Sequence, residues 1–204
     1  MIAVIDYKAG NVYNVLKACQ KIGVDAQLTA DPAEIKQADA VIFPGVGAFS
    51  NAMQTLRARN LVAAIKDTVS SGTPFLGICL GMQLLFDSST EFGNSQGLGL
   101  IPGQIVQIPD QNNQLMVPQT GWNQNQLKQP DSIFSSVNRQ YTYFTHSYYA
   151  RCDAKYIVAS VDYGVEIPAI VQKDNVYGFQ FHPEKSGQVG LQLLTTFFER
   201  AGLK

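Results

Sequence analysis

The chain has 204 residues, a formal net charge of −1 and 46% hydrophobic residues. A chain of this length and apolar content buries most of its surface on folding, which excludes a mostly disordered protein and predicts one well-packed domain over residues 1–204. The near-neutral charge argues against a nucleic-acid binder that depends on a basic surface. No apolar run is long enough to cross a membrane, so we expect no membrane partner.

The first half of the chain alternates short apolar runs with helical patterns. The apolar runs predict buried strands at 2–5, 24–30, 40–43 and 75–78. Helical spacing and capping signals predict helices over 12–22, after Asp31, across 50–70 and over 80–86. Such alternation is typical of a parallel sheet with helices on both faces.

The second half has a different pattern, with strand signals at close spacing. Strands are predicted at 103–108, 141–149, 156–161, 167–172 and 176–181, and a last amphipathic helix at 187–200. We therefore expect a single α/β domain with a mostly parallel central sheet, flanking helices and an antiparallel β extension.

Cysteine and histidine are scarce in this chain. Three cysteines and two histidines allow six Cys–His pairs. They stand at none of the close spacings that metal sites use, such as CxxC or HxxxH, so we expect neither a metal nor another cofactor. The odd number of cysteines and the lack of a signal peptide favour free thiols in the cytoplasm.

Residues 77–81, Gly-Ile-Cys-Leu-Gly, lie between an apolar strand and a helical pattern. This is the arrangement of a nucleophile elbow, in which a sharp turn exposes the nucleophile, here Cys79. The two glycines remove Cβ atoms that would collide across the turn, and the following helix end favours a thiolate. The backbone N–H of Leu80 can face an oxyanion. The alternative is a structural cysteine in a glycine-rich turn.

The strand predicted at 176–181 leads into His182-Pro183-Glu184. Residues two apart in an extended chain point to the same side, so Glu184 can hold one ring nitrogen of His182 while the other faces a nucleophile. The proline restricts the backbone of both neighbours. The alternative is a strand-end histidine beside a solvated glutamate.

The other cysteines and the second histidine have weaker signals. Cys19 lies on the apolar face of the first predicted helix and is expected in the core, whereas Cys152 has no elbow. His146 lies in a strand rich in aromatic residues. It is either a structural histidine of the sheet or a loop, with its hydrogen bonds made there, or part of a substrate pocket. Of the six pairs, only Cys79 with His182 combines an elbow with an orienting carboxylate.

The elbow and the His-Pro-Glu motif together resemble the two signatures of the class I, triad-type glutamine amidotransferases, in the same chain order. The resemblance extends over the whole chain and is closest to one branch of that family, the glutaminase subunits of imidazole glycerol phosphate synthase. It rests on the segments at 5–7, 10–11, 44–49, 77–83, 121–123, 146–148 and 181–186.

The resemblance implies a flavodoxin-like fold and glutaminase chemistry. Cys79 would attack L-glutamine, His182 and Glu184 would complete a catalytic triad, and a γ-glutamyl thioester would hydrolyse to glutamate and ammonia. Oxyanion donors would be the N–H groups of Val46 and Leu80. The glutamine pocket would be lined by Gly47, Gln83, Glu91, Ser147 and Tyr148.

The resemblance also implies a partner, a (β/α)₈-barrel cyclase subunit. This subunit would form a heterodimer with the chain and use the ammonia to make imidazole glycerol phosphate and AICAR in histidine biosynthesis. Interface positions would be Asn11, Asn14, Trp122, Asn123 and Lys185.

One departure from the family pattern and several alternatives remain. Gln119 stands where the family usually has a histidine, in a region expected on the partner side. Trp122, the only tryptophan, can alternatively lie in the hydrophobic core.

Other functions compatible with the triad are a glutaminase subunit for a paralogous synthase, such as one for sugar amination, and a stand-alone γ-glutamyl hydrolase. A regulatory module without activity is a third possibility.

Overall fold

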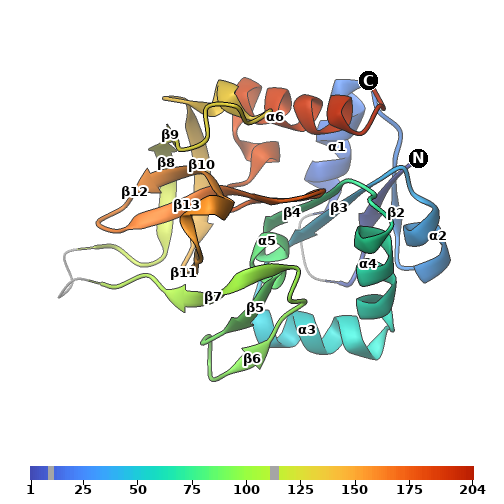
Figure 1. The fold of residues 1–204 in the computed structure, drawn as a ribbon, viewed down its shortest axis with the longest axis horizontal. Coiled ribbons are helices and arrows are strands. Elements are labelled where there is room, and N and C mark those ends of the chain that lie inside the picture. The colour runs from blue at the N-terminus through green and yellow to red at the C-terminus, as the bar shows by residue number, and fades with distance from the viewer. Residues whose placement is uncertain (9–11, 111–114) are drawn as a thin grey trace.

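An eight-stranded sheet runs through the centre of the protein (Figure 1). The structure is a computed structural model that describes residues 1–8, 12–110 and 115–204. Five neighbouring strands run parallel, in the order β2 (Ala26–Thr29), β1 (Ile2–Ile5), β3 (Ala40–Gly45), β4 (Phe75–Cys79) and β14 (Val176–Phe179). The same sheet continues antiparallel through β13 (Glu166–Lys173), β12 (Ile157–Asp162) and β9 (Gln126–Leu127). The predicted α/β fold with an antiparallel extension is confirmed.

Helices cover both faces of the sheet (Figure 1). One face carries α1 (Val12–Ile22) and α6 (Gly187–Arg200). The other carries α2 (Pro32–Gln37), α3 (Phe49–Ala58), α4 (Leu61–Ser70) and α5 (Leu80–Leu84). Alternate strand residues feed the two cores, because successive side chains of a strand point to opposite faces. Within the described parts of the chain, no helix has the length and apolar character needed to cross a membrane.

Two small sheets stand beside the central one. The first pairs β8 (Gln119–Gln124) with β10 (Tyr141–His146), and the second has the order β11 (Tyr148–Arg151), β7 (Ile101–Gln107), β5 (Phe86–Ser89) and β6 (Ser95–Gln96). Short 3₁₀ helices occur at η1 (Ser135–Val137), η2 (Ala154–Tyr156) and η3 (Pro183–Lys185).

Two predicted helices have different bounds in the structure. The helix expected across 50–70 is two helices, because Asn60 between them adopts a left-handed backbone with φ of 57°. The helix expected over 80–86 ends at Leu84, because carbonyls at its end accept hydrogen bonds from the segment at 98–101.

The strand predicted over 141–149 is two strands in different sheets. Ser147 separates β10 from β11, and its carbonyl accepts a hydrogen bond from the Ile108 N–H at 2.9 Å. The chain there passes from pairing with β8 to pairing with β7. A continuous polar–apolar alternation could not reveal this change of partner.

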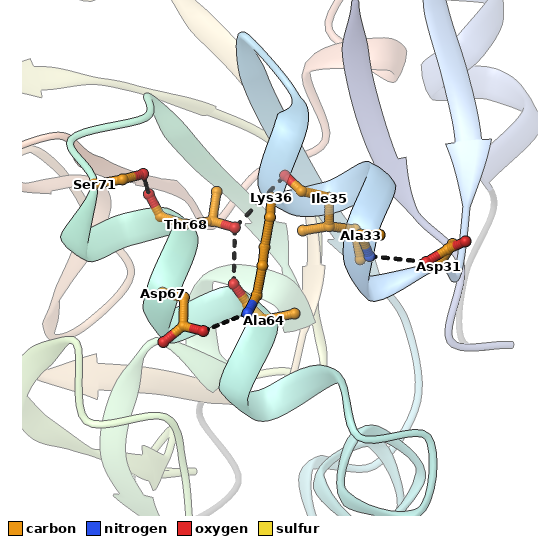
Figure 2. A network of polar contacts seen from close by, with 8 residues as sticks. All are labelled: Asp31, Ala33, Ile35, Lys36, Ala64, Asp67, Thr68 and Ser71. Atoms are coloured by element: carbon orange, nitrogen blue, oxygen red, sulfur yellow. Dashed lines mark hydrogen bonds and ion pairs between the residues drawn. The ribbon is translucent and has the colours of Figure 1, made fainter.

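Polar contacts cap α2 and connect it to α4 (Figure 2). The Asp31 carboxylate accepts the backbone N–H two residues further on at 2.8 Å, which is the cap that the Asp-Pro sequence predicts. Lys36 pairs with Asp67 at 2.5 Å, and the Thr68 hydroxyl reaches the Ile35 carbonyl at 3.5 Å. The Lys36–Asp67 pair is exposed and contributes little to stability, so apolar packing dominates this contact.

Gly81, near the start of α5, packs on β3 more closely than any other residue type allows. A Cβ atom at Gly81 would lie 1.7 Å from the Phe43 carbonyl oxygen.

We expect Gly81→Ala to lower the free energy of unfolding by about 3 kcal/mol or more, because α5 and β3 would have to separate. Urea unfolding followed by circular dichroism measures the loss. The control is Gly23→Ala, where a Cβ meets open space but φ is +86°, with an expected cost of about 1–2 kcal/mol. Equal losses in the two variants would contradict the close packing.

Candidate active site

The turn at Cys79 has the strained backbone of a nucleophile elbow. Cys79 ends β4 with φ of 55° and ψ of −112°, a conformation that residues with a side chain rarely adopt. A Cβ at Gly77 would lie 2.7 Å from the Met82 nitrogen, so this glycine clears the turn as predicted. Gly81 has a different role from the one predicted, because its missing Cβ clears β3 rather than the turn itself.

The end of β14 places His182 and Glu184 at the same edge of the sheet as Cys79. β14 runs beside β4 with Phe179 opposite Ile78, so the residues that follow reach the turn. The His182 Nδ1 lies 2.8 Å from Glu184 Oε1, as the two-residue spacing predicts, and both side chains are buried. The other nitrogen, Nε2, makes no hydrogen bond of ordinary geometry to a described residue.

His182 holds its proton far more tightly than a free histidine does. Burial lowers its pKa, but interaction with the Cys79 sulfur and with Glu184 outweighs burial and raises the pKa of His182 to about 10. The site therefore pairs an imidazolium with the sulfur on one side and a carboxylate on the other. Such a pair supplies a nucleophile and a general acid together.

A cavity of about 760 Å³ opens beside Cys79. The residues expected in the oxyanion hole and the glutamine pocket all line it, namely Val46, Gly47, Leu80, Gln83, Glu91, Ser147 and Tyr148. They come from segments far apart in the chain that the fold brings to one edge of the sheet. His182 and Glu184 lie behind Cys79 and do not line the cavity.

Glu91 connects this cavity to the start of α3. Its Oε2 accepts the backbone N–H of Phe49 at 2.6 Å, at the first residue of the helix. Ala48, the residue before the helix, has no side chain that could do this. Glu91 therefore caps α3 as well as lining the cavity, and its position is held by a charged hydrogen bond.

His146 also lines the cavity, as a neutral ring. Burial and the positive charge of His182 lower the pKa of His146 to about 4, against the opposing effect of its bond to the Tyr148 carbonyl. Because a carbonyl only accepts, the His146 Nδ1 at 2.8 Å from that oxygen carries the proton. Its Nε2 is a buried acceptor without a partner among the described residues. Of the two roles left open for His146, the structure favours the pocket.

Gln119 is buried rather than exposed, and its expected place on the partner side stays a prediction. It lies in β8 opposite His146 and is fully buried. Its amide nitrogen donates to the Asn123 side chain at 2.9 Å, and its amide oxygen has no described partner. The substitution therefore lies in the layer between the cavity and the outer surface.

Two of the expected interface residues meet at Tyr143. The Trp122 ring contacts Tyr143 edge-on with centroids 5.9 Å apart, and the Lys185 Nζ lies 5.7 Å from the centroid of the same ring. Trp122 is 52% exposed, so it does not fill core. Asn123 follows it in β8 and is half-buried. Exposed aromatic side chains such as Trp122 are enriched in binding surfaces.

The remaining expected interface residue in the described chain is Asn14, in α1. It lines a groove of about 370 Å³ that also reaches Lys17 and Glu184. The second carboxylate oxygen of Glu184, Oε2, is buried without a described partner. Asn11 lies outside the described residues.

Cys19 and Cys152 are remote from this chemistry. Cys19 is fully buried, and burial raises its pKa to about 12. Burial and the nearby charge of Asp153 raise the pKa of Cys152 to about 11. All three cysteines are free thiols, and within the described chain no three His, Cys, Asp or Glu side chains are grouped as metal ligands.

Two residues that touch the site were not predicted. The Gln180 amide nitrogen lies 4.0 Å from the Cys79 sulfur, and the spacing rule applied to His182 could have found it two residues earlier. The Tyr7 hydroxyl is buried beside Gly45 without a described partner. Burial and the charge of Cys79 hold its pKa far above the ordinary range. No local signal marks Tyr7, because its role depends on β1 lying next to β3.

We expect the pKa of His182 to fall in both Cys79→Ser and Glu184→Gln, because each variant removes a charge that favours the imidazolium. NMR titration of the imidazole measures this, with the exposed Glu199→Gln as control. The pKa of His182 is higher in the folded protein than its unfolded value of about 6.5, so its protonation stabilises the fold. This contribution to the free energy of unfolding is complete below about pH 6.5 and is lost as the pH rises toward the folded pKa. An unchanged pKa in both variants would contradict the assigned interactions.

Comparison with known proteins agrees with this geometry. A family model described as class-I glutamine amidotransferase matches residues 3–201. A relative from Lactiplantibacillus plantarum named imidazole glycerol phosphate synthase subunit HisH is 55% identical over 199 residues, covering 98% of this chain and 95% of the relative. A relative of the same name from Streptococcus sanguinis is 52% identical, covering 98% of this chain and 96% of its own.

Solved structures share the fold at much lower identity. A crystal structure described as a glutamine amidotransferase has a TM-score of 0.77 at 17% identity, covering 99% of this chain and 100% of the other. The structure of PurLQS from Thermotoga maritima has a TM-score of 0.74 at 18% identity, covering 98% and 97%. With its family match over nearly the whole length, the chain belongs to the class I glutamine amidotransferases.

Proposed function

We propose that this protein is the glutaminase subunit of an imidazole glycerol phosphate synthase, releasing ammonia from L-glutamine for histidine biosynthesis. The observation that carries the proposal is an elbow cysteine beside a buried His–Glu pair at the end of one cavity. The relatives of that name, at 55% and 52% identity over 98% of the chain, support the choice of synthase.

In the first half of the reaction, the Cys79 thiolate attacks the side-chain amide carbon of glutamine. The negative charge moves to the amide oxygen, and His182 gives its proton to the nitrogen as ammonia leaves. The raised pKa of His182 suits this step, because the ring is protonated before substrate arrives. The product is a γ-glutamyl thioester on Cys79.

In the second half, water attacks the thioester and His182 takes a proton from it. Acylation removes the negative charge of the sulfur, which is one of the influences that raise the His182 pKa, whereas burial still lowers it. The ring can therefore become a base at this stage. Expulsion of the sulfur as a thiolate releases glutamate and restores the starting charges.

The walls of the cavity supply the remaining functions. The N–H groups of Val46 and Leu80 would stabilise the oxyanion. Gly47 has φ of +108°, which favours glycine and lets the adjacent peptide reorient. Glu91 would attract the α-ammonium group of glutamine, and the other pocket residues would complete the site, namely Gln83, Ser147 and Tyr148.

Ammonia released into water would be protonated and lost, so this chemistry requires a docked acceptor. We propose a (β/α)₈-barrel cyclase subunit that binds through Asn14, Trp122, Asn123 and Lys185, and Asn11 stays an expected contact outside the described residues. An exposed tryptophan is among the residues that contribute most to binding. The free thiols suit the reducing cytoplasm as the place of assembly.

We expect Cys79→Ala to abolish glutamine hydrolysis and glutamine-dependent synthesis while leaving ammonia-dependent synthesis by the complex intact, because only the nucleophile is lost. Glutamate release and product formation are measured with and without the barrel subunit and its nucleotide ligand. Cys152→Ala is the matched control and should retain full activity. Glutamine turnover by Cys79→Ala would overturn the proposal.

The same assay separates the alternatives. The proposal predicts weak glutaminase activity for the chain alone and strong stimulation by the loaded barrel subunit. Full activity of the chain alone would favour a stand-alone γ-glutamyl hydrolase. Stimulation by a different synthase, such as one for sugar amination, would reassign the partner.

We expect Trp122→Ala to weaken binding of the barrel subunit roughly tenfold or more, because an exposed aromatic anchor is lost. The melting temperature should change little, since Trp122 is about half exposed. Isothermal titration calorimetry measures the affinity. Leu28→Ala, on the edge strand β2 of the eight-stranded sheet, is the control and should bind normally. Equal affinity of the two variants would remove Trp122 from the interface.

A further inference from the structure

Gln180 stands between β14 and the His-Pro-Glu motif, fully buried. Its backbone N–H donates to the Ala169 carbonyl at 2.9 Å, which fixes the main chain. Its side-chain nitrogen lies 4.0 Å from the Cys79 sulfur, and its side-chain oxygen lies 3.1 Å from the Gln83 amide nitrogen. The amide thus bridges the sulfur and a residue that lines the cavity.

The direction of this amide is set by the groups around it. The Gln83 side-chain nitrogen lies 2.8 Å from the Tyr148 carbonyl, which can only accept, so the Gln83 end facing it must be its NH₂ group. The second hydrogen of that group then points to Gln180 and requires the Gln180 oxygen as acceptor. The NH₂ group of Gln180 is left facing the sulfur.

We propose that Gln180 donates a hydrogen bond to the sulfur of Cys79, and that the chain from the Tyr148 carbonyl through Gln83 to Gln180 holds this donor in place. The inference rests on the proposed glutaminase function and adds a residue to it. Gln180 contacts a reacting atom, whereas Gln83 acts on the sulfur as a positioning residue. The chain also joins the thiol to the wall of the cavity where glutamine would bind.

An amide donor does something that His182 cannot do. His182 loses its proton when ammonia leaves and takes one back from the attacking water, so its support for negative charge on the sulfur varies through the cycle. An amide does not ionise in this pH range and therefore stays a donor throughout. Gln180 would stabilise the thiolate before attack and again when the sulfur is expelled from the thioester.

The test is the rate at which iodoacetamide alkylates Cys79, because this reaction needs neither glutamine nor a partner. Site-resolved mass spectrometry separates Cys79 from Cys152, which serves as the internal reference in the full chain. We expect Gln180→Met to slow alkylation of Cys79 at pH 7 roughly threefold to tenfold, which is the range for an ordinary hydrogen bond. Gln172→Met, the same change on neighbouring β13, should leave the rate unchanged.

Two further variants separate donation from packing. Gln180→Glu keeps the shape but places a buried carboxyl group against the sulfur. Burial and the thiolate would raise the pKa of this group well above its ordinary value of about 4.3. The deficit in alkylation should therefore grow from pH 6 to pH 8 as the carboxyl group ionises. Gln83→Met should give a smaller deficit, since it removes only the group that orients Gln180. If Gln180→Met does not fold, as judged by circular dichroism, Gln180→Glu decides the question.

The inference is overturned if folded Gln180→Met and Gln180→Glu alkylate at the wild-type rate across this pH range. It is also overturned if Gln180→Glu shows a deficit that does not vary with pH, because that result indicates packing alone. Either result leaves the glutaminase proposal intact. Glutamine turnover by Cys79→Ala would overturn that proposal without changing the alkylation result.

Discussion

The turn at Cys79 brings two strands and a helix closer together than side chains with a Cβ atom would permit. Gly77 clears α5, Gly81 clears β3, and a Cβ at Gly45 would lie 2.0 Å from the Tyr7 hydroxyl oxygen. Because the contacts at Gly77 and Gly81 are with backbone atoms, the position of the sulfur is set largely by main-chain geometry. The cavity and the approach of His182 are both arranged around that fixed point.

The charge on His182 follows from the same close approach. A buried imidazolium is unfavourable by itself, and here Cys79 on one side and Glu184 on the other sustain it. His146, buried nearby without such partners, is held neutral instead. The two histidines therefore differ in charge: His182 is positive because it lies between negative groups, and His146 is neutral because it is buried beside the positive His182.

Residues far apart in the chain meet because β14 inserts next to β4 and parallel to it. The segment between them, from β5 to β13, folds outward to make the small sheets and the antiparallel extension. Those elements supply His146, Ser147 and Tyr148 to the cavity and Trp122 to the outer surface. The parallel half of the sheet thus carries Cys79 and leads into His182, and the second half carries part of the cavity wall and the exposed Trp122.

Local patterns in the sequence were sufficient for much of this protein. Apolar runs located the parallel strands, because strands buried on both faces are apolar throughout. Helical spacing located the long helices, because burial of one face leaves a period of about 3.6 residues. The glycine-flanked Cys79 and the spacing of His182 and Glu184 identified the chemistry, since both depend on backbone geometry over a few residues.

Only the tertiary structure decided the rest. It placed Gln119 inside and Trp122 outside, divided the strand at Ser147 between two sheets, and aimed Gln180 at the sulfur. Each of these depends on which strand becomes the neighbour of which, and that choice is made by contacts between residues distant in the chain. A residue's type and its near neighbours carry no record of such contacts.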